Sequence, residues 1–479
     1  MSRRVTGRFG VVVTAIGMVM AVAPAAAQEA GESQYELEEI LDRARGFAPL
    51  VQEHEARQDH ARWQQFRADR AWWPRIEAQT LLAPVPADAD PSRIDENLDE
   101  IFALNIGPFI RQTARVTVPV YTFGRISAAR ELAAIGVDVS ELRADAAIQD
   151  HLLLARQAYY GRQLSRAFEE LIEEGGGLVK DTLEQMEEDR AFGEADFSTE
   201  DLRRLQIFDA ELDALILDNR RLGDLTEAAL RYLADLEGPV EVPALTPAQA
   251  DVGLEEVEHY QELARVHRPE IRQLELAVEA RRTQTDLQRA EFYPNLFVAF
   301  DFGFGWSNKS PAFQRVCRRV DPDGPCIDSE TLYTRPYSNP FSSLTFGMAL
   351  GLQWRLDFAQ QYGRLQESRA LEVQIEAQEE RALGGLRLEI EQAWRTAKDA
   401  RERVDIEGRR YDAARRWRNQ YGLQTQVGRG DLRDAIDPLR AYYQARVAQL
   451  EATHTYLNAR AELARAVGLE DLDDSRDGE

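Results

Sequence analysis

Residues that could carry out chemistry are scattered along this chain rather than grouped in motifs. No two histidines have the i,i+4 spacing that places two zinc ligands on one helix face. The run Gly175–Gly177 near Lys180 lacks the G-x-x-x-x-G-K-[ST] pattern of a phosphate-binding loop, and no G-x-S-x-G segment offers a nucleophilic serine. The sequence therefore predicts no enzyme, no cofactor and no metal site. The histidines are His54, His60, His151, His259, His267 and His454.

The only two cysteines are Cys317 and Cys326, in a segment rich in arginine and aspartate. Two thiols are too few for a disulfide scaffold or for a four-thiolate zinc site. If the protein is exported, the pair could form one disulfide in an oxidising compartment. The alternative is two free thiols in a solvated extracellular loop.

Composition narrows the class of protein. The 479 residues include 83 Asp and Glu against 58 Lys and Arg, so the net charge is −25. This acidic balance argues against a nucleic-acid-binding protein, which needs a basic surface. Charged residues make up 29 % of the chain, which excludes a protein built mainly of membrane-spanning helices, and 44 % hydrophobic residues exclude generic disorder.

The N-terminus indicates export. Arg3, Arg4 and Arg8 precede an apolar run at 11–22, and small residues follow at 25–27. This is the pattern of a cleaved signal peptide, and the run is too short to cross about 30 Å of hydrocarbon as a helix. We expect residues 1–27 to be removed.

Two halves of the chain carry similar landmarks in the same order. Trp72-Trp73-Pro74 resembles Phe292-Tyr293-Pro294, and Gln157-Ala158-Tyr159 resembles Gln392-Ala393-Trp394. The sequence therefore predicts a tandem duplication. After the signal peptide, the expected parts are a first repeat at 28–237, a linker at 238–254, a second repeat at 255–470 and an acidic tail at 471–479.

Each half predicts the same series of elements. A helix, at Glu36–Trp72 or Glu255–Phe292, is followed by a strand, a polar loop, a second strand and two long helices. Three glycines at Gly175–Gly177 are expected to interrupt the first long helix, because glycine disfavours helix. Apolar steps of three and four residues in the last helix predict a coiled-coil-like seam, formed by Tyr443, Val447, Leu450, His454, Leu457, Ala461 and Ala464. We assign His454 to packing there. Leu164, Phe168 and Leu171 repeat the pattern in the first half.

The strands of the second half alternate between large apolar residues and small or polar ones. Alternation over about ten residues is typical of transmembrane β-barrel strands. A half-buried strand of a soluble sheet alternates in the same way, but such strands average about five or six residues. We therefore favour the barrel. The residues expected to face lipid are Phe300, Phe302, Phe304, Phe346, Met348, Leu350, Leu352 and Trp354.

A barrel of four strands cannot close, because the smallest bacterial barrels have about eight. Open strand edges in lipid leave backbone groups unpaired at a cost of several kcal/mol each. Several copies of the chain must therefore assemble. The strand pattern alone fits either a dimer or a trimer.

Three features of the sequence occur together. The helix–Pro–strand plan is repeated, Phe123-Gly124-Arg125 stands at the entry to a long helix, and Val427-Gly428 precedes a helix reversal. With these features the chain resembles the TolC-like outer-membrane efflux protein family over about residues 35–469. The resemblance implies an α+β membrane protein. By this resemblance the protein would form a homotrimer in which four strands from each chain complete one β-barrel. Long helices continue the barrel as a coiled-coil tunnel in the periplasm.

The resemblance also implies helix-reversal tips and a periplasmic aperture. The tips fall at Gly193 and Asp201 in the first half and at Val427 and Gly428 in the second. Asp434 and Asp437 match paired aspartates that line the aperture in the family. The alternative is that Asp437 only caps a helix that begins at Pro438.

The predicted function is an exit duct in the cell outer membrane. It would passively export small molecules as part of a tripartite efflux pump. The partners implied are a periplasmic adaptor protein, an inner-membrane transporter and outer-membrane lipid. Two alternatives are the duct of a type I protein secretion system and, in a different class, a periplasmic coiled-coil scaffold.

Overall fold

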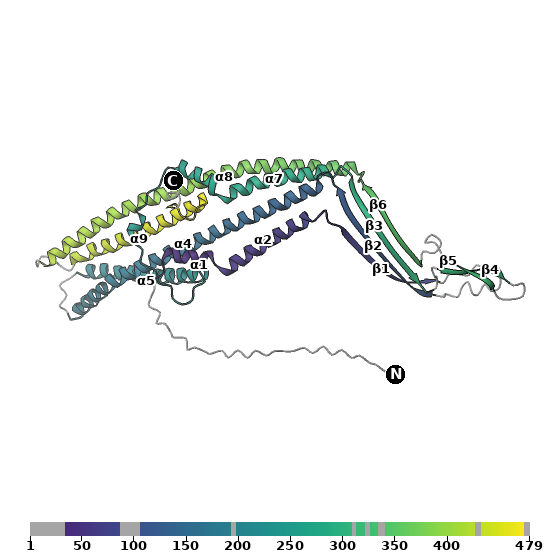
Figure 1. Ribbon diagram of the computed structural model, residues 1–479. Coiled ribbons are helices and arrows are strands. Elements are labelled where there is room, and N and C mark those ends of the chain that lie inside the picture. The colour runs from purple at the N-terminus through teal and green to yellow at the C-terminus, as the bar shows by residue number, and fades with distance from the viewer. Residues whose placement is uncertain are drawn as a thin grey trace, which may run out of the picture.

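The computed structural model describes residues 34–86, 106–192, 198–308, 313–320, 326–333, 341–426 and 433–473. The predicted signal peptide and residues 474–479 of the predicted tail lie outside this part of the chain. Long helices form an elongated bundle, and a β-sheet extends from one end of it (Figure 1).

In the described part of the first half there are four helices and two strands. They are α1 (Leu37–Arg45), α2 (Ala48–Asp69), β1 (Arg75–Pro86), β2 (Ile106–Tyr121), α4 (Arg125–Phe192) and α5 (Thr199–Leu233). A short 3-10 helix, η2 (Pro247–Ala250), follows in the predicted linker.

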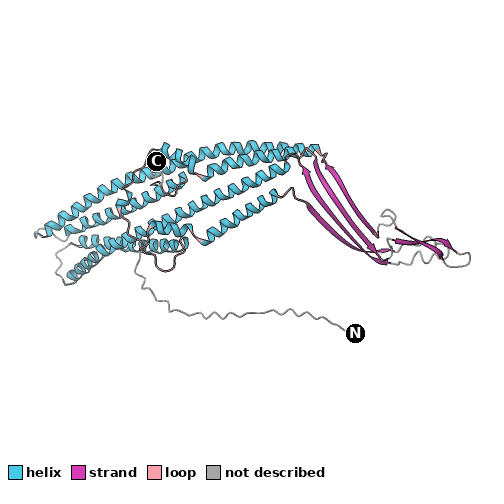
Figure 2. Ribbon diagram, in the orientation of Figure 1, coloured by secondary structure: helices cyan, strands magenta, loops and turns pink. Residues whose placement is uncertain are grey.

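The second half repeats that order with one addition. Its elements are α6 (Val257–His267), α7 (Pro269–Ala290), β3 (Asn295–Ser307), β4 (Phe313–Val320), β5 (Cys326–Tyr333), β6 (Ser343–Gln353), α8 (Phe358–Gln426) and α9 (Arg433–Val467). The β4–β5 hairpin lies beyond the main sheet (Figure 2). The sequence reasoning missed this hairpin and treated the segment as a loop.

The predicted first helix of each half is wrong in one respect, because it is two helices. The break falls at Gly46 and Phe47 in the first half and at Arg268 in the second. Pro49 and Pro269 then stand in the first turns of α2 and α7. Proline has no backbone N–H and is best tolerated in a first turn, where that group would have no partner within the helix, so each proline favours the start of a new helix.

The expected interruption at Gly175–Gly177 is also wrong, since α4 runs through all three residues. A Cβ on Gly175 would lie 2.2 Å from both Cζ and Oη of Tyr443 on α9. Glycine at 175 therefore allows a tyrosine ring to approach the helix, which explains the residue without a break.

The main sheet is antiparallel, with four strands in the order β1-β2-β3-β6. β2 bridges the two halves by pairing with both β1 and β3. Each strand leads directly into or out of a helix of the bundle (Figure 1). Because β1 and β6 stand first and last in the strand order, they are the edge strands of the sheet.

Helix packing confirms the predicted seam of α9. Leu450, Leu457, Ala461 and Ala464 are all buried, and Leu164, Phe168 and Leu171 of α4 are buried too. α4 packs against α2, α5, α7 and α9, while α8 packs against α7 and α9. Among the described residues, no helix is both long and apolar enough to span a bilayer.

Candidate channel wall and helix tips

The main sheet has two chemically different faces. The register aligns Val116, Phe300 and Met348 across β2, β3 and β6, and the next row on the same face aligns Ala114, Phe302 and Phe346. Side chains alternate along a strand, so every second row shares a face. Phe346 is 78 % exposed and Leu350 74 % exposed. The face is a continuous apolar surface that this chain alone leaves uncovered.

All but one of the residues expected to face lipid lie on this apolar face. Phe300, Phe302 and Phe304 pair with Met348, Phe346 and Leu344, while Leu350 and Leu352 pair with Val298 and Leu296. Trp354 lies one residue beyond β6, and its indole N–H donates to the carbonyl of Phe292 over 3.0 Å. Its role is to tie the end of β6 to the end of α7.

The opposite face is polar or small. One row crosses the strands as Glu77, Arg115, Asp301 and Gly347, with Arg115 Nε donating to Asp301 Oδ1 over 2.5 Å. The next row on this face contains Gln79, Thr113, Gly303 and Thr345. Such a surface suits contact with water.

Aromatic rings gather where the strands meet the helices. Phe123 stacks on Tyr293 with ring centroids 5.2 Å apart and meets Tyr121 edge-on at 4.6 Å. Trp72 and Trp73 are both more than half exposed. Amphipathic aromatic rings favour the boundary between hydrocarbon and water, so this junction has the composition of a membrane interface.

The structure describes part of the predicted tips. Asp201 forms a capping box with Ser198 at the start of α5, with Ser198 Oγ donating to Asp201 Oδ2 over 2.6 Å. Gly193, Val427 and Gly428 lie outside the described residues. Asp434 lies in the first turn of α9, and Asp437 follows one turn later.

The helix-cap alternative for Asp437 is wrong. Because α9 begins at Arg433, Asp437 stands inside the helix and not at its N-cap. The Asp437 carboxylate is 60 % exposed and lies 4.0 Å from Nη1 of Arg204 on α5. This contact joins the two halves near their tips.

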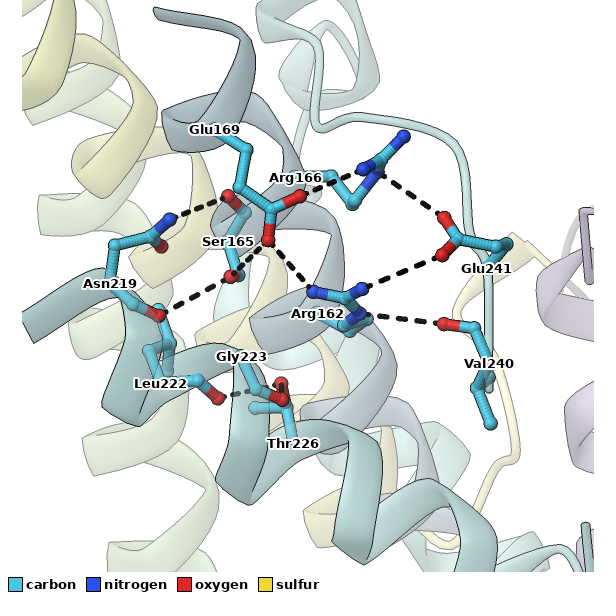
Figure 3. Close-up of polar contacts among 10 residues, drawn as sticks. All are labelled: Arg162, Ser165, Arg166, Glu169, Asn219, Leu222, Gly223, Thr226, Val240 and Glu241. Atoms are coloured by element: carbon cyan, nitrogen blue, oxygen red, sulfur yellow. Dashed lines mark hydrogen bonds and ion pairs between the residues drawn. The ribbon is translucent and has the colours of Figure 1, made fainter. Parts of the chain in front are cut away.

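A polar network fixes the linker between the halves onto α4 and α5 (Figure 3). Arg162 is 7 % exposed, and its Nη1 donates to Glu169 Oε1 over 3.1 Å. Glu241 of the linker lies 3.9 Å from Arg162 and 3.5 Å from Arg166. Across the helix interface, Asn219 Nδ2 donates to the Ser165 carbonyl over 3.2 Å.

Sequence reasoning missed this network, although its spacing is a signal. Positions 162, 165, 166 and 169 share one helix face. Nothing in the sequence says that the linker returns to that face.

His454 lies on the seam of α9, as expected, and burial lowers its pKa. Its Nε2 lies 3.0 Å from Nδ2 of Asn458. Within the described ranges, no group of three His, Cys, Asp or Glu side chains could hold a metal ion. The β4–β5 register places Cys317 opposite Ser329 and Cys326 opposite Val320, and the disulfide stays a prediction.

Comparison with known proteins gives both a family and a fold. Residues 261–469 match the model of the family described as outer membrane efflux protein. No curated protein matches the chain.

Several solved structures are similar throughout. A CusC structure, described in terms of folding and transmembrane channel formation, has 12 % identity and a TM-score of 0.70, covering 91 % of this chain and 92 % of its own. The Campylobacter jejuni CmeC outer membrane channel has 14 % identity and a TM-score of 0.67, covering 92 % and 88 %. The Neisseria gonorrhoeae MtrE outer membrane channel, in its open state, has 18 % identity and a TM-score of 0.65, covering 91 % and 89 %.

These findings confirm the resemblance inferred from the sequence. The fold is that of TolC-like channels. The family match supports the predicted outer-membrane location and a transport role rather than an enzymatic one.

Proposed function

We propose that this chain, whose second half matches the outer membrane efflux protein family, is one third of an exit duct that spans the outer membrane. The observation that carries the proposal is the main sheet, with one exposed apolar face, one polar face and an edge strand on each side. The apolar face would meet lipid and the polar face would line a water-filled lumen.

Closure requires more than one copy. In lipid, the free edges of β1 and β6 would leave backbone N–H and C=O groups without partners. Pairing β6 of one copy with β1 of the next removes every edge, and three copies then give twelve strands. The matching order of elements in the two halves supports a tandem duplication within each copy.

Molar mass tests the assembly. The detergent-solubilised protein should be a trimer in light scattering after correction for bound detergent. A folded, monodisperse monomer would overturn the duct.

Neighbouring residues of β6 test the two faces. Met348 is 70 % exposed on the apolar face, whereas a Cβ on Gly347 would meet nothing within 4 Å on the polar face. Met348→Arg should cost about 2–4 kcal/mol if it lies near the bilayer midplane. Gly347→Arg is the matched control and should be mild. Equal loss of folded protein from outer membranes for both variants would contradict the assignment of the faces, and a larger loss for Gly347→Arg would reverse it.

The helices would form a periplasmic tunnel whose far end is the aperture. Asp434 and Asp437 are three residues apart in α9, a spacing that places both on one helix face. Three copies would present six carboxylates, a ring that favours cations. Asp437→Ala and the double alanine variant should lower cation preference in single-channel recordings.

Asp201→Ala is the control at the neighbouring tip. It removes the capping box of α5 and should lower stability by about 1 kcal/mol without changing selectivity. Unchanged selectivity in the double aspartate variant would remove these residues from the aperture.

Export through this duct would be passive, because its proposed role needs only a continuous pore. The energy and the choice of cargo would come from an inner-membrane transporter, joined to the helix tips by a periplasmic adaptor protein. Cross-linking from cysteines placed in the exposed first turn of α5, at Glu200 for example, should trap the adaptor in cells. Trapping from β6 instead would contradict this docking site.

A further inference from the structure

A cavity of about 650 Å³ lies where α2 meets β1, with α4 forming its other wall. Three arginines line it, namely Arg67, Arg70 and Arg75. Trp73 lines it as well, and the wall formed by α4 consists of the apolar side chains Ala129, Leu132 and Ala133. No aspartate or glutamate is among its lining residues, although the chain carries a net charge of −25.

Within the described residues, no acidic side chain neutralises the positive charges of this cavity. Arg67 and Arg75 form no hydrogen bond or ion pair with another residue in the described part of the chain. The Arg70 guanidinium lies 3.3 Å above the Phe66 ring and 5.3 Å from the Trp73 ring. Stacking on a ring leaves the in-plane N–H groups of a guanidinium free to donate.

Two other arginines of α2, the helix that carries Arg67, have acidic partners. Arg57 pairs with Glu53, and Arg62 lies 3.7 Å from Glu141. Asp69, beside Arg70 in the sequence, already binds Arg130 over 2.9 Å. Arg67 is therefore an exception among the arginines of α2, and Arg70 and Arg75, which follow the helix, likewise have no acidic partner in the described part of the chain.

The second half shows that the fold does not need these charges. When Pro74 is matched with Pro294, Leu287, Ala290 and Asn295 take the positions of the three arginines. The same helix–strand junction thus forms there without a basic group at these three positions, and its Arg289 is paired with Asp286. Clustered like charges repel one another, so an arginine cluster without acids is a place for an external anion.

We propose that this cavity binds a phosphate ester. Guanidinium forks match phosphate oxygens in geometry and charge, and basic pockets at membrane boundaries bind lipid headgroups. The cavity lies beside exposed Trp72 and Trp73 and at the first residue of β1. The phosphate could belong to an anionic lipid headgroup or to a small solute in the periplasm.

Binding to the purified full-length oligomer in neutral detergent tests the site. The probes are short-chain phosphatidylglycerol and sn-glycerol 3-phosphate, titrated calorimetrically at low salt. The double variant Arg67→Gln/Arg75→Gln should bind about a hundredfold more weakly, roughly tenfold for each charge-assisted hydrogen bond removed. The control variant Arg57→Gln/Arg62→Gln also loses two positive charges, both from α2. It should bind the two probes as the unmodified protein does.

The two probes separate the sources of the phosphate. Binding of the lipid alone assigns the cavity to a headgroup, and binding of both assigns it to phosphate esters in general. Binding of neither probe would overturn the proposal. Equal weakening in the two double variants would do so too, because only net charge would then matter.

Discussion

The two long helix pairs, α4–α5 and α8–α9, have nearly the same lengths but different interfaces. α4 and α8 have 68 and 69 residues, and α5 and α9 have 35 each. Matching Gln157-Ala158-Tyr159 with Gln392-Ala393-Trp394 places Ala397, Ala400 and Val404 at the positions of Arg162, Ser165 and Glu169. One interface is polar and the other is apolar at corresponding points.

The environment of each pair explains the difference. The first pair receives the start of the linker, whose Glu241 side chain and Val240 carbonyl contact Arg162, whereas Ala250 near the end of the linker packs on the second pair. Ala397, Ala400 and Val404 belong instead to a core with Tyr456 and Leu463. An extended segment brings backbone groups that need hydrogen-bond partners, so the helix beneath it carries polar side chains. The same helical frame thus tolerates two chemistries.

The largest expected effect comes from breaking the polar interface. Arg162→Ala should destabilise the protein by about 3 kcal/mol, because it breaks a buried ion pair. This value is the lower end of the range for such a loss, since Glu169 keeps Arg166 as a partner. The triple variant Arg162→Ala/Ser165→Ala/Glu169→Val copies the other interface and should recover part of that loss. Denaturation of the oligomer followed by circular dichroism measures both. Equal losses would show that the interfaces are not interchangeable.

The contact between the two pairs gives the next effect. Gly175→Ala would place a methyl group against the Tyr443 ring, which is partly buried among residues of α4 and α5. Overpacking of this kind costs about 1–3 kcal/mol. Gly177 has nothing within 4 Å, so Gly177→Ala should stabilise the helix by up to about 1 kcal/mol. The same stability assay would contradict the close contact if both variants were stabilised.

A smaller loss is expected within the first pair. A Cβ on Gly223 of α5 would lie 2.8 Å from Ser165 Oγ of α4. The clash in Gly223→Ala is partly offset by the better helix propensity of alanine, for a net cost of about 1 kcal/mol. Adding Ser165→Ala should relieve most of it. A double-mutant cycle measures that coupling, and strict additivity would refute the contact.

The smallest effect is a difference in pH dependence between the pairs. Burial lowers the pKa of His454 in α9, so the folded state binds fewer protons than the unfolded state. Stability should therefore fall as the pH decreases through the ordinary histidine value of about 6.5, until the lower folded pKa is passed. His454→Gln should remove this part of the slope.

When α5 and α9 are aligned from their first residues, Arg220 of α5 takes the position of His454. Arg220 is exposed. Arg220→Gln is therefore the matched control and should leave the slope unchanged. An unchanged slope in His454→Gln would show that other groups cause the pH dependence.

The sequence alone determined features that follow from local periodicity. The two-residue alternation in β3 and β6 was enough to place Phe302 and Phe346 on one face, because strand geometry fixes that period. The steps of three and four in α9 identified Leu450 and Leu457 as buried for the same kind of reason. The resemblance to outer-membrane channels followed from the order of these elements.

Only the tertiary structure decided what depends on neighbours distant in the sequence. Gly175 looks like a helix breaker until Tyr443 of α9 is seen against it. Asp437 looks like a helix cap until α9 is seen to begin at Arg433. Arg162 and Arg67 are both arginines in helices, yet one is buried against the linker and the other lines an open cavity. Propensity describes what a residue prefers in isolation, whereas the packing of other elements fixes the space, charge and partners around it.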